Sequence, residues 1–154
     1  MAPATIKLHD ILKENVDLLS NNAAKKQIQL LNKIDSSAQA FADVNMVSTV
    51  IRNLMSNAIK YTKDKGSITG SYKIDNDKGE ISISDTGVGI KPENLDKLFK
   101  IDVNYLTKGT ANETGTGLGL ILCKEFINKN GGEIWVESEF GKGSIFKFTL
   151  PLKK

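Results

Sequence analysis

The sequence predicts an α+β fold, a two-layer α/β sandwich with helices on one face of a mixed, mostly antiparallel sheet. The chain has 154 residues, 40% hydrophobic and 25% charged, which is typical of one globular domain over residues 1–154. Segments with the helical period alternate with pairs of strand-like segments. Turn-forming residues separate the strands of two of these pairs. Strand pairs and separate helices together favour a sheet that helices cover on one face.

The first half of the chain predicts two helices. Residues 8–26 carry apolar side chains at helical spacing, so we expect an amphipathic helix there. Residues 27–31 and 38–42 follow as short strands. Residues 44–61 form the strongest predicted helix, which begins after the candidate cap Asp43. Its apolar positions recur at helical spacing: Val47, Val50, Ile51, Leu54 and Ala58.

Two strands follow, and then a helix. We expect the strands at residues 68–74 and 80–85, because both segments are rich in β-formers. The turn-rich residues 75–79 join them. A short helix is predicted from Pro92 to Phe99, ahead of a polar, glycine-containing segment.

The C-terminal part predicts a helix and a hairpin. An apolar helix is expected from residue 119 to about residue 130, where Gly131 and Gly132 stop it. Strands at 133–139 and 144–150 then form a hairpin around the turn at 140–143.

Charge and composition exclude several classes of protein. Twenty-one Lys and Arg face eighteen Asp and Glu, for a net charge of +3 without any run of five like charges, so we expect no nucleic-acid partner. No apolar run approaches the roughly 18 residues of a membrane span, and the N-terminus lacks a signal-peptide core. We therefore expect a cytoplasmic domain, whose parent protein can still be membrane-bound. The single cysteine, Cys123, stands in an apolar stretch and is interpreted as a small buried hydrophobe.

Three polar residues share one side of the helix predicted at 44–61. Asn53, Asn57 and Lys60 fall within roughly 60° of one another on a helical wheel, beside the apolar face. A solvated helix face is one interpretation. The other is a site for a magnesium triphosphate, because Mg²⁺ takes hard oxygen ligands and keeps waters and phosphates in its shell.

Asp85 ends a strand with its side chain on the core side. It has the same parity as Ile81 and Ile83, so the strand directs its carboxylate inward. A buried carboxylate needs hydrogen-bond donors. It either turns back to the amides of Thr86 and Gly87 or receives a ligand donor such as the exocyclic amine of adenine. Gly87 and Gly89 would let the backbone approach a flat ring closely.

A second glycine cluster, residues 115–119, opens a helix. Helix N-termini with free amides bind phosphates. Leu120 occupies the place of the last glycine of a dinucleotide-binding fingerprint, and Gly143 follows Lys142 where a Walker loop needs Ser or Thr, so both of these motifs are excluded. What remains is a glycine hinge of a phosphate lid, or simple helix capping.

In this order, the segments resemble the catalytic and ATP-binding domain of two-component sensor histidine kinases, within the GHKL ATPase superfamily. The asparagine box resembles residues 53–62 (NLMSNAIKYT), and the first glycine box residues 85–90 (DTGVGI). The phenylalanine box resembles residues 98–102 (LFKID), and the second glycine box residues 115–120 (GTGLGL). The resemblance covers nearly the whole chain and implies a Bergerat-type fold with a mobile ATP lid over about residues 100–118.

The resemblance also implies a set of site residues for Mg-ATP. Asn57 would hold Mg²⁺, Asn53 and Lys60 would meet the phosphates and the metal, Tyr61 would flank the nucleoside, and Asp85 would receive the adenine amine. The catalytic residues would be Asn53, Lys60 and Lys100. The remaining nucleotide-binding positions would be Gly87, Gly89, Ile90, Phe99, Thr107, Lys108, Gly115, Thr116, Gly117, Leu118 and Gly119.

Two positions distinguish the chain within the superfamily. The gyrase and chaperone branches usually place a glutamate base at the position of Asn53, and an amide cannot take a proton at neutral pH. Asn53 therefore argues for transfer to a nucleophile that needs little activation, such as neutral imidazole. Lys100 stands where many members have an arginine, so charge is kept while bidentate geometry is lost.

The expected function is transfer of the γ-phosphate of ATP to a histidine on a separate dimerisation domain. His9 is the only histidine and lacks the acceptor context of a following proline, so we expect it to serve the start of a helix. The expected partners are ATP or ADP, the histidine-bearing dimerisation domain of a parent kinase, and a response regulator receiver domain. We expect this piece itself to be monomeric. The alternatives are a GHKL-type ATPase and a nucleotide-gated binding module without transfer.

Overall fold

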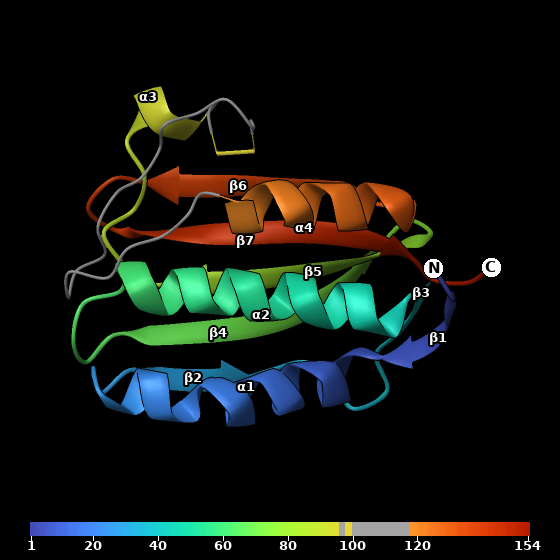
Figure 1. Ribbon diagram of the computed structural model, residues 1–154, viewed down its shortest axis with the longest axis horizontal. Coiled ribbons are helices and arrows are strands. Elements are labelled where there is room, and N and C mark those ends of the chain that lie inside the picture. Colours follow the sequence, from blue (N-terminus) through green and yellow to red (C-terminus); the bar gives the residue numbers. More distant parts are fainter. Residues whose placement is uncertain (96–97, 100–117) are drawn as a thin grey trace.

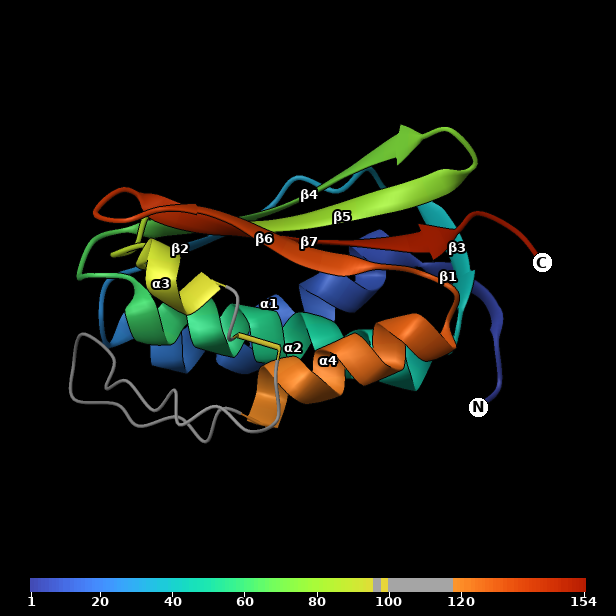
Figure 2. The ribbon, with the colours of Figure 1, turned by 90° about the horizontal axis from the view of Figure 1, so that it is seen from above.

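A computed structural model describes residues 1–95, 98–99 and 118–154, with only the backbone of Leu118 included. Helices α1 (Leu8–Ala24), α2 (Val44–Tyr61) and α4 (Leu118–Lys129) lie on one face of a five-stranded sheet, and no described helix covers the other face (Figures 1 and 2). The strands of this sheet, in spatial order, are β2 (Gln29–Asn32), β4 (Ser67–Asp75), β5 (Lys78–Asp85), β7 (Gly143–Pro151) and β6 (Ile134–Glu139). The predicted two-layer architecture is confirmed. In the part of the chain described, no helix has the length and apolarity needed to cross a membrane.

The sheet is mixed and mostly antiparallel, as predicted. Strand β2 pairs with β4 in parallel, and the other three neighbouring pairs are antiparallel. A separate two-stranded sheet joins β1 (Ala4–Lys7) to β3 (Gln39–Ala42). Strand β1 was not predicted, because a four-residue strand with one buried side chain, Ile6, has too little pattern to be recognised locally.

The core lies between the helices and the inner face of the sheet. Alternation along β5 and β7 turns Ile81, Ile83, Phe146 and Phe148 toward the helices, and each is at most 2% exposed. The face of α2 that meets them carries the predicted apolar residues, of which Val47, Val50, Ile51 and Leu54 are fully buried. This packing fixes the rotation of α2 about its axis. It therefore decides which polar residues of α2 lie near the end of the sheet where β5 ends. Cys123 is also fully buried, as predicted, and burial raises its pKa to about 12.

Several predicted boundaries differ from the structure by one or two residues: the helix predicted at 8–26 ends at Ala24, and the strand predicted at 27–31 is β2 at Gln29–Asn32. Two other predictions are wrong by more. Helix α3 covers Pro92–Leu95, whereas Leu98 and Phe99 lie in a turn instead of in the predicted helix. Both side chains pack inward, and the Phe99 ring meets the ring of Phe146 edge-on with centroids 6.5 Å apart. The connection between β4 and β5 is tighter than predicted, because Asp75 pairs directly with Lys78. Asn76 takes the positive φ, 60°, that a two-residue hairpin turn requires.

Candidate functional site

Most of the candidate residues that the structure describes gather at one end of the molecule. There α2 and β5 end, and β4 and β7 begin, on the left of Figure 1. The backbone amide of Val88 donates to the carbonyl of Tyr61 at 3.1 Å. This bond brings the end of the segment NLMSNAIKYT against the segment DTGVGI, although they are more than twenty residues apart in the chain.

Asp85 is the buried acid of this region, and only 8% of it is exposed. Its Oδ1 accepts from the Gly87 amide at 2.8 Å. Burial raises the pKa of the carboxyl to about 6, and the amides of Gly87 and Ser144 lower it in part. The carboxylate therefore accepts from a local amide, which was one of the two alternatives that the sequence left open. These hydrogen bonds do not offset the whole free-energy cost of burying the charge.

The polar side of α2 lies half-buried. Asn53, Asn57, Lys60 and Tyr61 are each neither fully exposed nor fully buried. Asn53 faces α4, where a Cβ added to Gly119 would stand 3.7 Å from its Cγ. The Lys60 ammonium lies 4.9 Å from the centre of the Tyr61 ring. The helix thus presents two amides, one ammonium and one phenol ring in a row that ends beside the segment 85–90.

Gly87 and Gly89 are required by close contact with the protein's own backbone. A Cβ on Gly87 would overlap the Tyr61 carbonyl oxygen and lie 2.8 Å from Asp85 Oδ1. Gly89 has a φ of 72°, and a Cβ there would overlap the Glu139 carbonyl. The function predicted for both glycines was the close approach of a ligand ring. The structure adds a reason that holds before any ligand is present.

A hairpin between β6 and β7 holds this glycine segment from the other side. The Gly141 amide donates to the Val88 carbonyl at 2.6 Å, and the Ile90 amide donates to Ser138 Oγ at 2.8 Å. Ser138 Oγ in turn donates to the Gly143 carbonyl at 3.0 Å. Ser138 was not among the predicted site residues. The sequence pattern that could have revealed it is a serine on the same side of strand β6 as Ile134 and Val136.

Several predicted site residues lie outside the described part of the chain. These are Lys100, Thr107, Lys108, Gly115, Thr116 and Gly117, together with the side chain of Leu118. Phe99 is described, and its ring packs against the core residue Phe146. Among the residues described, no three His, Cys, Asp or Glu side chains form a group that could hold a metal ion.

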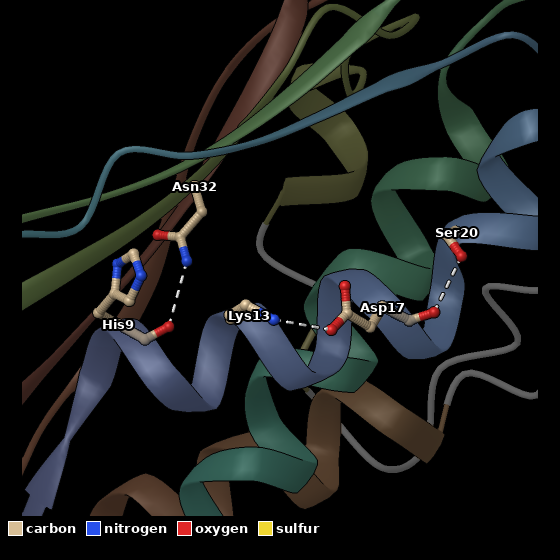
Figure 3. Close-up of polar contacts among 5 residues, drawn as sticks. All are labelled: His9, Lys13, Asp17, Ser20 and Asn32. Carbon is tan, nitrogen blue, oxygen red and sulfur yellow. Dashed lines mark hydrogen bonds and ion pairs between the residues drawn. The ribbon is translucent and has the colours of Figure 1, made fainter. Parts of the chain in front are cut away.

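His9 lies at the start of α1, at the opposite end of the fold. Its Nδ1 is 2.7 Å from the Ile34 carbonyl, and Asn32 Nδ2 donates to its backbone carbonyl at 3.1 Å (Figure 3). Farther along the helix, Lys13 and Asp17 form an exposed pair at 3.2 Å. His9 thus joins the beginning of α1 to the segment after β2, consistent with a role at a helix start.

Comparison with known proteins places this geometry in a family. Residues 42–154 match the family model described as "Histidine kinase-, DNA gyrase B-, and HSP90-like ATPase". The adaptive-response sensory kinase SasA of Synechococcus elongatus is 36% identical over 152 residues, covering 97% of this chain and 39% of that protein. Sporulation kinase E of Bacillus subtilis is 36% identical over 146 residues, covering 94% of this chain and 19% of that protein. The chain thus spans about two fifths or less of these relatives.

Solved structures agree with the fold. The nucleotide-free catalytic domain of histidine kinase ThkA superposes with a TM-score of 0.85 at 28% identity, and each chain is covered in full. A complex of ThkA with the response regulator protein TrrA matches with a TM-score of 0.77 at 24% identity, over 98% of this chain and 42% of that one. The chain therefore belongs to the family of histidine kinase-, DNA gyrase B- and HSP90-like ATPases, as an ATP-binding catalytic domain of the sensor histidine kinase type.

Proposed function

We propose that this chain holds Mg-ATP where α2 ends against the segment 85–90 and positions its γ-phosphate for transfer to a histidine of a separate domain. One observation carries the proposal. The hydrogen bond from the Val88 amide to the Tyr61 carbonyl sets the polar row of α2 beside the incompletely compensated carboxylate of Asp85. A hydrogen-bond acceptor for the base, Asp85, and polar groups suited to phosphates, those of α2, then lie at the same end of the fold.

Each end of the nucleotide has a matching partner in this proposal. Asp85 accepts the exocyclic amine of adenine, which guanine does not offer at that position. Tyr61 flanks the nucleoside, while Asn53 and Lys60 meet the phosphates. The amides at the start of α4, near Gly119, suit a phosphate oxygen because a helix N-terminus carries partial positive charge.

Asn57 is the proposed protein ligand of Mg²⁺. Its amide oxygen is hard, and the side chain is half-buried on the polar row of α2. One protein oxygen is sufficient, because Mg²⁺ is commonly bound through one or two protein groups together with substrate phosphates and waters. The ion would neutralise charge on the phosphates when bound.

Phosphoryl transfer here requires positioning and charge neutralisation more than proton removal. A neutral imidazole nitrogen attacks the γ-phosphorus as the bond to the β,γ-bridging oxygen breaks, and ADP leaves with that bond's electron pair. Asn53 orients without accepting a proton. In this proposal Lys100 supplies a point charge to the γ-phosphate.

The acceptor histidine and the response regulator belong to other domains or proteins. His9 does not suit the role, because its Nδ1 is 2.7 Å from the Ile34 carbonyl at the far end of the fold. The complex of ThkA with TrrA supports a response regulator as the downstream partner.

The test combines the chain with γ-labelled ATP and the histidine-bearing helix of its parent kinase. We expect acid-labile label on that helix and almost none on this chain. Steady release of phosphate without the helix would instead favour an ATPase. Nucleotide binding without either reaction would leave a nucleotide-gated binding module.

The metal assignment is tested separately with Asn57→Ala. We expect the variant to lose affinity for Mg-ATP much more than for adenosine, because only the triphosphate uses the ion. Ser56→Ala, at the adjacent exposed position, is the control. Unchanged magnesium dependence in Asn57→Ala would assign Asn57 to a solvated helix face.

A further inference from the structure

The C-terminal end of α2 is capped by groups from two other parts of the chain. The last four carbonyls of an α-helix have no partner within it. Here Lys26 Nζ donates to the carbonyls of Ile59 and Lys60 at 2.8 and 3.3 Å, and the Val88 amide donates to that of Tyr61 at 3.1 Å. Three of the last four carbonyls of α2 are therefore bonded from outside the helix.

Lys26 reaches this position from the turn that closes α1. The Ile28 amide donates to the Ala23 carbonyl and the Gln27 amide to the Ala24 carbonyl, both at 3.0 Å, with Gln27 at a φ of 54°. This is the bonding of a Schellman motif, in which the chain reverses after one left-handed residue. The reversal turns the Lys26 side chain inward.

The burial of this lysine is unusual. Lys26 is only 6% exposed, although lysine is almost never fully buried unless its ammonium has partners. The backbone of the turn is fixed as well, because the Lys65 amide donates to the Lys26 carbonyl at 2.9 Å. The turn after α1 is thus joined by its backbone to the connection after α2, and by the Lys26 side chain to the last turn of α2.

We propose that Lys26 is a positioning residue of the nucleotide site, holding the last turn of α2 so that Lys60 and Tyr61 face the segment 85–90. A cation at a helix C-terminus offsets the negative end of the helix dipole. Without it, the carbonyls of Ile59 and Lys60 would lose this charged donor. This inference rests on the proposed function, because that function assigns Lys60 and Tyr61 to nucleotide binding.

The first experiment measures the order of the helix end without nucleotide. Lys26→Met keeps the length of the stem and removes the ammonium. Lys25→Met is the matched control, because Lys25 is the exposed neighbour in the same turn. We expect amide hydrogen exchange at Val88, whose partner is the Tyr61 carbonyl, to quicken in Lys26→Met and to stay unchanged in Lys25→Met.

The second experiment measures Mg-ADP binding by calorimetry at a temperature where every variant is folded. We expect Lys26→Met to weaken binding by about 5- to 30-fold, the effect of removing a cation from a helix C-terminus, and Lys25→Met to leave it unchanged. In a background with both Lys60→Ala and Tyr61→Ala the same substitution should weaken binding by less than about threefold, because both side chains being positioned are gone. Lys26→Gln, which keeps an N–H donor, replaces Lys26→Met if that variant does not fold.

The outcomes separate the two proposals. If the unmodified chain does not bind Mg-ADP, the proposed function fails, and the exchange rate at Val88 still decides whether Lys26 orders the helix end. A variant that melts at lower temperature but keeps its affinity and its Val88 exchange rate would overturn the positioning role. An equal loss of affinity with and without the Lys60 and Tyr61 side chains would also overturn it.

Discussion

Two aspartates of this fold, Asp43 and Asp85, expose the same small fraction of their surface, but Asp85 lies deeper in the protein, and the pKa values of their carboxyls shift in opposite directions. Each is 8% exposed. Asp43 precedes α2, where its carboxylate accepts from the amides of Ala2 at 2.8 Å and Met46 at 3.0 Å. Those bonds, from Ala2 first, lower the pKa of its carboxyl. At Asp85, burial dominates over the two backbone amides, and the pKa rises to about 6.

The opposite pKa shifts distinguish a carboxylate with a structural role, Asp43, from one that can still accept a hydrogen bond from a ligand, Asp85. The donors around Asp43 come from the protein and stabilise its charge, and its own amide donates to Asn130 Oδ1 at 2.8 Å, so Asp43 joins α2 to the end of α4. Asp85 holds a charge that its protein donors do not fully stabilise. A ligand that brings another donor would complete the set. The two sites should therefore respond differently to the same kinds of change.

The largest expected effect is on ligand binding at Asp85. Asp85→Asn keeps the shape of the side chain but replaces an acceptor with an ambiguous amide, so adenine binding should weaken by about 1–3 kcal/mol, the range for a charge-assisted hydrogen bond. Asp77→Asn, in the exposed turn between β4 and β5, is the control. Calorimetry with ADP measures both. Equal ADP affinity in Asp85→Asn, or equal affinity of the unmodified chain for GDP, would refute the assignment.

At Asp43 we expect a loss of stability and no loss of nucleotide affinity. Asp43→Ala removes the cap of α2 and should lower the free energy of unfolding by about 1–2 kcal/mol, as measured by urea titration. Its affinity for Mg-ADP should be unchanged where it is folded, because the cap lies at the other end of the helix. A selective loss of affinity would show that the two ends of α2 are not independent.

A change of pH should affect binding through Asp85. With a pKa of about 6, roughly one tenth of this carboxyl is ionised at pH 5 and nearly all of it at pH 8. Adenosine, which has no phosphate to titrate, should then bind about tenfold more weakly at pH 5. Asp85→Asn should bind with little change between these pH values. A flat profile in the unmodified chain would mean that ionised Asp85 does not receive the base.

Stability should respond to pH with opposite signs at the two aspartates. The raised pKa of Asp85 contributes stability below its ordinary value of 3.8, and this contribution is lost as pH rises through about 6. The lowered pKa of Asp43 contributes stability above 3.8, which is lost as pH falls. Urea titrations of the nucleotide-free chain should therefore show Asp85→Asn gaining stability relative to the unmodified chain between pH 4 and pH 7. No such gain would contradict the shift at Asp85.

The sequence predicted the parts of this comparison that follow from local periodicity. The bounds of α2, the cap at Asp43 and the inward direction of Asp85 all follow from spacing along one helix or strand. A mixed, mostly antiparallel sheet with helices on one face also followed from that pattern, whereas the pairing of the strand at 38–42 with β1 in a separate sheet did not.

Contacts between distant segments were not predictable in the same way. Strand β1, the hydrogen bond from the Ile90 amide to Ser138 Oγ and the burial of Lys26 each depend on a partner at least thirty residues away. A lysine after a helix or a serine in a strand is ordinarily solvated, so neither residue type reveals such a contact. Only tertiary packing decides it.

The smallest expected effect concerns the turn that carries Lys26. Gln27 holds a φ of 54°, a conformation that costs a residue with a Cβ about 1–2 kcal/mol, while glycine loses about 0.5–1 kcal/mol of chain entropy on folding. Gln27→Gly should therefore raise the free energy of unfolding by up to about 1 kcal/mol. The Mg-ADP affinity should not change, because the turn and the Lys26 side chain keep their place. Gln29→Gly, in the extended strand β2, is the control and should lower stability by about 0.5–1 kcal/mol. A loss of stability in Gln27→Gly comparable to that of the control would mean that the left-handed turn is not kept in solution, and the inward path of Lys26 would lose its basis.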